Sequence, residues 1–320
     1  QAVKNLSQGP YASATVLNLL HRHIFADGVM QNAHIIDGGT NQYAEALMKI
    51  CRSFGTEVCL AQKVESIITD NGCCKGVQLS NGEKVIAEEV VSGLDPRNTF
   101  HRLVGHKNVS PEFKRQINNI KFRGSTARIH LALSGLPEMN GILPEEMSAI
   151  FTIAPSINYI EKAFDNIKYG RISEKPVIEF SIPSLLNPSF CEQGKHVLSI
   201  TVQYAPYHLR NAKWDEHHKD QLFRNTMRVC KKYMPEIESL IEKKLILSPA
   251  DMEMEYGLTE GSLSHGELTL DQFWFMRPII RSSQYQTPIK NLYLCGQGTH
   301  PGPGLHGANG LNAANLIYSL

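Results

Sequence analysis

The residues best suited to chemistry lie near the end of the chain, where glycine is concentrated between a short apolar segment and a helix-like segment. The stretch reads LYLCGQGTHPGPGLHGANGLNAA, residues 292–314, and its glycines are Gly296, Gly298, Gly302, Gly304, Gly307 and Gly310. Glycine has no Cβ and lets a ligand approach the backbone, and the first N–H groups of a helix have no partner within that helix. The pattern therefore predicts a strand, a ligand-binding loop and a last helix that begins near residues 305–307.

The spacing of these glycines restricts the ligand. It is neither the GxGxxG order of a dinucleotide-binding turn nor a triphosphate loop, and the basic residue that a triphosphate needs is missing. We expect a ligand that is only partly anionic and is held by backbone groups. A flavin ring fits, because the negative charge of its reduced form develops at an edge that a helix N-terminus can stabilise. The alternative is a tight packing turn without a ligand.

Three residues elsewhere are weak catalytic candidates. His265 and Arg277 lie in SHGELTLDQFWFMRP, and Tyr207 lies in QYAPYH. His265 is either a general base or a structural histidine, and Arg277 either binds a substrate anion or forms an ordinary salt bridge. No His, Cys and carboxylate spacing matches a zinc site, so no metal is predicted.

The composition excludes several classes of protein. The chain has 320 residues and a net charge of +1, with no basic stripe for nucleic acid. Its apolar runs are far shorter than the ~20 residues of a membrane helix. Seven cysteines without a CxxC pair suggest free thiols in the cytoplasm, or in the mitochondrial matrix if the source is a eukaryote. Because Gln1 stands first, we expect that a natural N-terminal part is absent from this sequence.

The periodicity predicts an α/β protein of the α+β type. Apolar residues at helical spacing follow Gly38–Gly39 up to Gly55, and a period of two then runs to Gly93, with hairpin turns at Asn71–Gly72 and Asn81–Gly82. The segments RIHLALSG, VIEFSIPSL and HVLSITVQYAP are strand-like. The stretch 220–246 is amphipathic at helical spacing, and we expect Pro235 to separate two helices there.

Several stretches together resemble one known family. The glycine-rich end of the chain, IDGGTNQYAEALMKICRSFGTEV, VESIITDNGCCKGVQLSNGEKVIAEEVVSGLDP and SHGELTLDQFWFMRP occur in the order seen in phytoene desaturase-like, FAD-dependent oxidoreductases. The resemblance covers nearly all of the chain from about Asn32 onward. It implies a discontinuous FAD-binding domain, 34–100 and 286–320, and a substrate domain, 1–33 and 101–285, built around an inserted mixed sheet.

The resemblance also implies a set of cofactor-binding residues. Val64 matches a position against the adenine, although an ordinary strand core residue is the alternative. Ser92 and Gly93 match a strand end near the phosphates, and Gly38 and Gly39 match a turn that approaches the flavin ring. The remaining predicted contacts come from the terminal segment and are Gly296, Gly298, Thr299, His300, Gly302, Gly304, Gly307 and Ala308.

This chain departs from the family in one large respect, because the strand–GxGxxG–helix unit that opens such proteins is missing. Three explanations stay open: a longer polypeptide carries that unit, a partner chain supplies it, or FAD binding has been lost. We favour the first and expect FAD to bind weakly or not at all to this chain alone. The expected function is hydride transfer from an apolar or amphipathic small molecule to flavin, with peripheral membrane contact left open. The alternative is a non-catalytic interaction or regulatory protein that keeps the fold.

Overall fold

The computed structural model describes residues 2–13, 15–23, 36 and 38–319. The described chain divides into two compact units, each made of two separate segments. Unit 1 comprises Gln1–Val58 and Gly124–Tyr256, and unit 2 comprises Cys59–Arg123 and Gly257–Leu320. Parts of the predicted 1–33 segment, together with positions 34, 35 and 37, lie outside the described residues.

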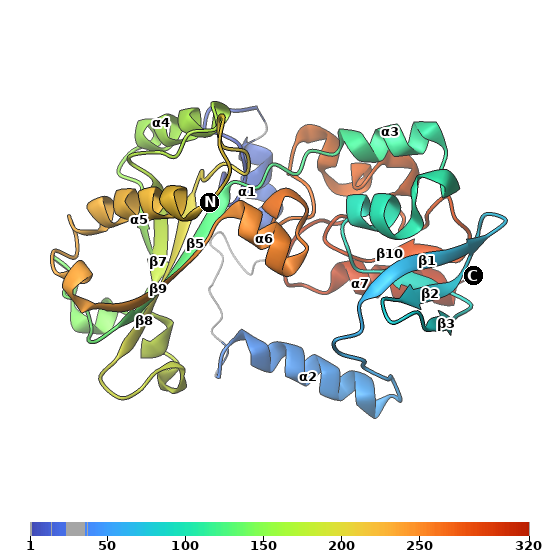
Figure 1. Ribbon diagram of the computed structural model, residues 1–320, viewed down its shortest axis with the longest axis horizontal. Coiled ribbons are helices and arrows are strands. Elements are labelled where there is room, and N and C mark those ends of the chain that lie inside the picture. The colour runs from blue at the N-terminus through green and yellow to red at the C-terminus, as the bar shows by residue number, and fades with distance from the viewer. Residues whose placement is uncertain (1, 14, 24–35, 37, 320) are drawn as a thin grey trace. The chain divides into compact units, whose positions relative to one another are not determined.

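Unit 1 is built on a five-stranded sheet with the strand order β6-β7-β8-β5-β9 (Figure 1). The strands are β5 (Thr126–Leu133), β6 (Phe151–Ile153), β7 (Val177–Ser181), β8 (His196–Gln203) and β9 (Ile241–Leu247). The helices of the unit are α1 (Thr15–His23), α2 (Thr40–Ser53), α4 (Ile157–Lys168), α5 (Glu216–Cys230) and α6 (Pro249–Tyr256).

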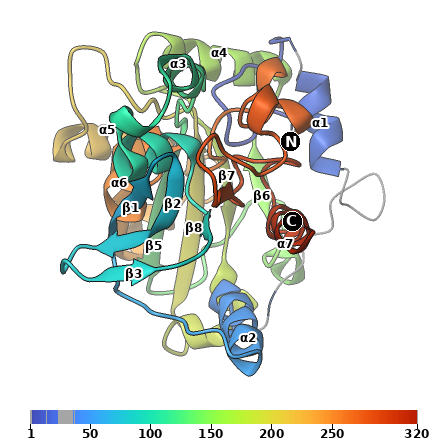
Figure 2. The same cartoon turned by 90° about the vertical axis from the view of Figure 1, so that its right-hand side faces the viewer.

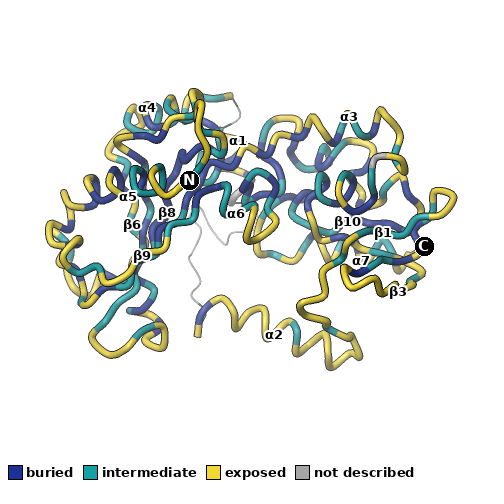
Figure 3. Tube along the Cα trace, viewed as in Figure 1, coloured by how far each residue is buried: buried dark blue, intermediate teal, exposed yellow. Residues whose placement is uncertain are grey.

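One face of this sheet forms the core of unit 1, and the other face is polar. Ile129 and Leu131 of β5 pack with Ile200 of β8, and α5 contributes to the same apolar cluster. The opposite face carries a row of cross-strand neighbours in which Arg128 lies beside Thr201, and Thr201 beside Glu179. Figure 3 shows β8 as largely buried, whereas α2 is mostly exposed.

The strand pairs of this sheet are all antiparallel among the described residues, whereas we expected a mixed sheet. The physical reason lies in the alternation of RIHLALSG. Parallel sheets are usually buried on both faces and are apolar throughout, but antiparallel sheets commonly have one polar face. The polar residues Arg128 and His130 between apolar neighbours are typical of the antiparallel case.

The prediction of a second helix in 220–246 is wrong. Helix α5 ends at Cys230, a short 3₁₀ turn covers Ile237–Leu240, and Ile241–Leu247 is strand β9. β9 pairs with β5 at the edge of the sheet. Local helical spacing was overridden by hydrogen bonds to a strand more than a hundred residues earlier in the chain.

Unit 2 contains a three-stranded antiparallel sheet and a separate two-stranded parallel pair. The strands are β1 (Val64–Asp70), β2 (Cys73–Leu79), β3 (Lys84–Ile86), β4 (Val90–Ser92) and β10 (Leu292–Leu294), and the α-helices are α3 (Pro111–Asn119) and α7 (Ala308–Tyr318). Figure 2 shows β1, β2 and β3 side by side. Both predicted hairpin turns are confirmed, because β1–β2 and β2–β3 are antiparallel pairs joined at Asn71–Gly72 and Asn81–Gly82.

The boundary between the units differs from the one we expected. Residues 101–123 and 257–285 belong to unit 2, and residues 38–58 belong to unit 1. Within unit 2, the Asn98 amide donates to the Gly257 carbonyl at 2.9 Å, and Arg97 pairs with Glu260 at 2.6 Å. Contacts between residues far apart in the sequence therefore place 101–123 and 257–285 in unit 2.

Candidate functional site: a strand-end pocket and glycine loop in unit 2

The glycine loop starts where two parallel strands end side by side. Leu294 of β10 lies beside Ser92 of β4, and the Cys295 N–H donates to the Ser92 carbonyl at 2.9 Å. The next residues, Gly296 and Gly93, meet backbone to backbone. A Cβ on Gly296 would stand 2.4 Å from the Gly93 carbonyl oxygen, so only glycine fits at this crossing.

Helix α7 holds the loop through its own side chains. The Asn309 amide donates to the carbonyls of Thr299 at 3.0 Å and His300 at 3.1 Å. The Asn312 amide donates to the Tyr285 hydroxyl at 2.8 Å, and that hydroxyl donates to the His300 carbonyl at 2.9 Å. The loop is therefore fixed in shape by one turn of the helix that it leads into.

The N-terminal end of α7 is open within unit 2. The helix begins at Ala308, after Gly307 in a left-handed conformation with φ 66°, which agrees with the predicted start. The His306 Nδ1 atom accepts the Ala308 N–H at 3.1 Å. Apart from each glycine's chain neighbours and the backbone of its own helix, no described atom lies within 4 Å of where a Cβ would stand on Gly307 or Gly310. The positive end of the helix dipole is thus not covered by packed side chains at these two positions.

A pocket of about 410 Å³ lies next to this strand end. Three residues predicted to contact the cofactor line it together, namely Val64, Ser92 and Gly93. The Ser92 hydroxyl lies 2.8 Å from the Thr99 hydroxyl, which fixes its direction. The sequence reasoning missed the rest of the wall, which consists of Lys63, Ile67, Val77, Val90, Val91, Leu94, Arg102 and Leu103. Residues 63–64, 77, 90–94 and 102–103 meet only through the fold, so no local pattern could have assembled them.

His265 lies beside the glycine loop. Its Nδ1 atom is buried and has no hydrogen-bond partner in the described part of the chain. That atom stands 3.1 Å from the Cβ position of Gly296. Burial lowers the pKa of His265, and Arg277 lowers it further, while the charge of Asp95 opposes both. His265 therefore favours the neutral imidazole, which has one nitrogen able to accept a proton.

Arg277 is fully buried and donates only to backbone carbonyl groups. Its guanidinium reaches Gln297 at 3.0 Å, Gln272 at 3.3 Å, Gly266 at 2.9 Å and also Ser264. Burial lowers the pKa of Arg277 to about 9. These bonds tie the His265 segment to the glycine loop, which is a structural role. Its role as a catalytic group stays a prediction.

The other predicted residues lie in unit 1. The Tyr207 hydroxyl donates to the Glu253 carboxylate. The Gly38 N–H donates to the Asn187 side chain at 2.8 Å, and a Cβ on Gly39 would stand 2.7 Å from the ring of Phe190. The predicted cofactor residues are thus divided between the units, and so are the catalytic candidates.

No group of three His, Cys, Asp or Glu side chains among the described residues is arranged to hold a metal ion. No helix among those residues is both long enough and apolar enough to span a bilayer.

Comparison with known proteins identifies the class. The family model for flavin containing amine oxidoreductase matches residues 10–317, and the chain belongs to that family. Pyridine nucleotide-disulfide oxidoreductase domain-containing protein 2 of Rattus norvegicus is 30% identical over 328 residues, which cover 99% of this chain and 56% of the rat protein. The resemblance drawn from the motifs is thereby confirmed.

More distant relatives agree. A phytoene desaturase (lycopene-forming) of Pseudescherichia vulneris is 25% identical over 300 residues, covering 93% of this chain and 57% of that protein. The crystal structure of an oxidoreductase from Methanosarcina mazei superposes with a TM-score of 0.55 at 14% identity, over 88% of this chain and 55% of that one, and supports the α/β fold. This chain spans little more than half the length of these relatives.

Proposed function

We propose that this chain forms part of the FAD-binding site and the substrate unit of an FAD-dependent oxidoreductase. The observation that carries the proposal is the pocket at the end of β4, where Val64, Ser92 and Gly93 come together next to the glycine loop of β10 and α7. Family membership supports it, because the matching family is defined as flavin containing.

The residues of unit 2 fit the chemistry of FAD. The pocket wall is mostly aliphatic, which suits a flat ring system, and Lys63 and Arg102 bring positive charge for phosphate. The open start of α7 offers N–H groups and a positive dipole end to a group that gains negative charge. FAD, when bound, would supply the acceptor for the hydride that leaves the substrate.

The roles of the protein residues follow from their surroundings. Neutral His265 would take the proton that a substrate loses together with its hydride. Arg277 would keep His265 and the loop in register through its four carbonyl bonds. In unit 1, the polar sheet face with Arg128, His130 and Glu179 favours the amphipathic over the purely hydrocarbon class of substrate.

We also propose that a further segment of the same polypeptide completes the cofactor site. Strands β4 and β10 form a parallel pair, and parallel sheets are normally larger and covered on both faces. Val91 and Leu94 at this pair are exposed. The sequence lacks a GxGxxG turn for the pyrophosphate. We therefore expect weak or no FAD binding by residues 1–320 alone.

The test compares two proteins, residues 1–320 and the product of the whole reading frame, by flavin absorbance after purification and by titration with FAD. We expect the whole product to be yellow and its flavin to be reducible, and the shorter chain to bind FAD weakly. Stoichiometric FAD on residues 1–320 would overturn the need for a further segment. A colourless whole product that takes up no FAD would overturn the cofactor assignment and favour the interaction protein.

A further inference from the structure

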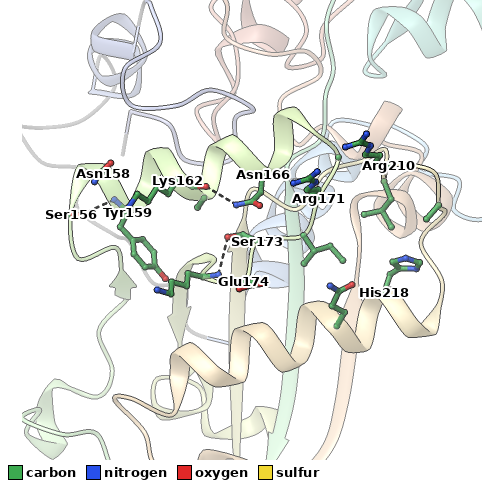
Figure 4. Close-up of a pocket in the computed structure, with 17 residues that line it drawn as sticks. Ser156, Asn158, Tyr159, Lys162, Asn166, Arg171, Ser173, Glu174, Arg210 and His218 are labelled. Atoms are coloured by element: carbon green, nitrogen blue, oxygen red, sulfur yellow. Dashed lines mark hydrogen bonds between the residues drawn. The ribbon is translucent and has the colours of Figure 1, made fainter.

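Unit 1 contains a second pocket whose chemistry differs from that of the flavin site. It has a volume of about 760 Å³, within the range of small-molecule sites. Its walls come from α4, the 170–175 segment, the 209–212 segment and the first turns of α5, all within unit 1 (Figure 4). Neither the proposed cofactor residues nor the catalytic candidates line it.

Positive charge dominates this pocket. Lys162, Arg171, Lys175 and Arg210 line it, and Glu174 is the one carboxylate among the lining residues. None of these four cations forms an ion pair within the part of the chain that the structure describes. Lysines elsewhere in the same unit do pair, for example Lys168 with Asp165 at 2.7 Å and Lys231 with Glu238 at 2.7 Å. The pocket therefore holds charge that the protein itself does not neutralise.

The two arginines are held together by the backbone of their loops. The Arg210 N–H donates to the Gly170 carbonyl at 2.9 Å, and the Arg171 N–H donates to the Asn166 carbonyl at 2.9 Å at the end of α4. Gly170 has a φ of 63°, and a Cβ there would stand 2.8 Å from both the Arg210 nitrogen and the His208 carbonyl oxygen. Figure 4 shows Arg171 and Arg210 near one end of the pocket and Tyr159 toward the other.

The remainder of the wall suits an organic group. Ala163 and Ile172 are buried, and Leu209 lies beside them in the lining. The Tyr159 hydroxyl is occupied by the Pro176 carbonyl at 3.0 Å, which leaves its ring as a fixed surface. A volume of about 760 Å³ is several times that of a phosphate ion, so an anion bound by the arginines would leave room for a carbon skeleton.

We propose that the pocket between α4 and α5 binds a phosphorylated small molecule, with its phosphoryl group at Arg171 and Arg210 and its organic part along Tyr159 and Ile172. One guanidinium group can donate two parallel hydrogen bonds to two oxygens of a phosphate. Unpaired cations from two loops also match the charge of a phosphate ester. A ligand with a single carboxylate group in place of the phosphate would neutralise less of the four positive charges. The site is separate from the cofactor pocket and does not depend on FAD.

The first experiment is calorimetric titration of residues 1–320 with phenyl phosphate, inorganic phosphate and benzoate. We expect saturable binding at one site, tightest for phenyl phosphate because it fills both parts of the pocket. Arg171→Gln and Arg210→Gln should each weaken it about tenfold or more, since each removes a charge-assisted pair of hydrogen bonds. Arg224→Gln is the matched control, because Arg224 is an exposed arginine of α5 outside the pocket lining.

A second measurement needs no variant. Phenylglyoxal modifies accessible arginines, and mass spectrometry reads the sites. Phenyl phosphate should protect Arg171 and Arg210 but not Arg224. Equal protection of all three arginines, no saturable binding of phenyl phosphate, or binding seen only with phosphatidic acid vesicles would each overturn the proposal. Benzoate binding as tightly as phenyl phosphate would overturn the assignment to a phosphoryl group.

Discussion

The two pockets of this chain are built by different physical means. The pocket of unit 2 lies at the end of β4, the strand that pairs with β10 ahead of the glycine loop, and has a mostly aliphatic wall. The pocket of unit 1 lies between two helices and presents exposed, unpaired cations. Binding a ligand through backbone groups requires a rigid loop. Binding an anion through long cationic side chains requires only that the loops carrying them be held close together. The two sites should therefore respond differently to substitution.

The largest effect is expected from Arg277→Met. This change leaves four buried carbonyl groups without their donor and should lower the free energy of unfolding by about 3–5 kcal/mol. Arg277→Lys, which keeps the charge with fewer donors, should lie between it and wild type. Arg224→Met, at an exposed position of α5, serves as the control. Urea denaturation measures the stability of all three variants. A loss of unfolding free energy below 1 kcal/mol for Arg277→Met would refute the structural role of Arg277 in tying the His265 segment to the glycine loop.

The second effect separates cofactor binding from stability. Gly93 has no left-handed φ, and a Cβ there would meet only Cys295 Sγ at 3.9 Å, so Gly93→Leu places a side chain in the pocket without a backbone clash. We expect FAD affinity of the whole reading-frame product to fall by about 2–3 kcal/mol, which is roughly 30- to 140-fold. Gly135→Leu is the matched control, since its Cβ would meet only Leu240 at 3.8 Å in unit 1. Equal FAD affinities for the two variants would contradict the placement of the cofactor.

The third effect concerns the rigid frame of the unit 1 pocket. Gly170→Ala combines a positive φ with a backbone collision, whereas Gly141→Ala has a φ of 78° and open space around its Cβ. Both should cost about 1 kcal/mol for backbone strain, and Gly170→Ala about 1–2 kcal/mol more. Thermal unfolding gives the stabilities, and phenyl phosphate titration shows whether the arginines have separated. Unfolding curves that coincide for the two variants would show that the 170–210 contact is loose.

The smallest expected effect is on the pH dependence of the free energy of unfolding. The pKa of His265 is lowered by burial and by Arg277, against Asp95, so the unfolded chain binds a proton more readily than the folded chain does. Stability should therefore fall as the pH drops below the ordinary histidine value near 6.5. His265→Gln should flatten this fall, and the same substitution at His217, an exposed position of α5, serves as the control. Chemical denaturation between about pH 5 and 8 tests it, and parallel curves for wild type and His265→Gln would show that His265 titrates normally.

Local features of both units were predictable because they depend on neighbouring residues. The hairpins at Asn71–Gly72 and Asn81–Gly82 and the start of α7 after Gly307 follow from residues that adopt positive φ at little cost. The strand β9 was not predictable, because 241–247 has helical spacing and becomes a strand only by pairing with β5. The sequence around Arg277 indicated a candidate residue but not its hydrogen bonds, because its carbonyl acceptors lie on three separate segments.

The sequence alone determined the family, through the resemblance of its motifs, and the α/β class, because short-range spacing encodes turns, strands and helix starts. Only the tertiary structure decided which residues share a pocket. Val64 lines one pocket with Ser92 and Gly93 although β1 and β4 belong to different sheets, and the Arg171 and Arg210 segments meet because Gly170 allows two loops to touch. Such contacts join residues tens of positions apart, and their free energy depends on the packing of the whole unit, which no local pattern records.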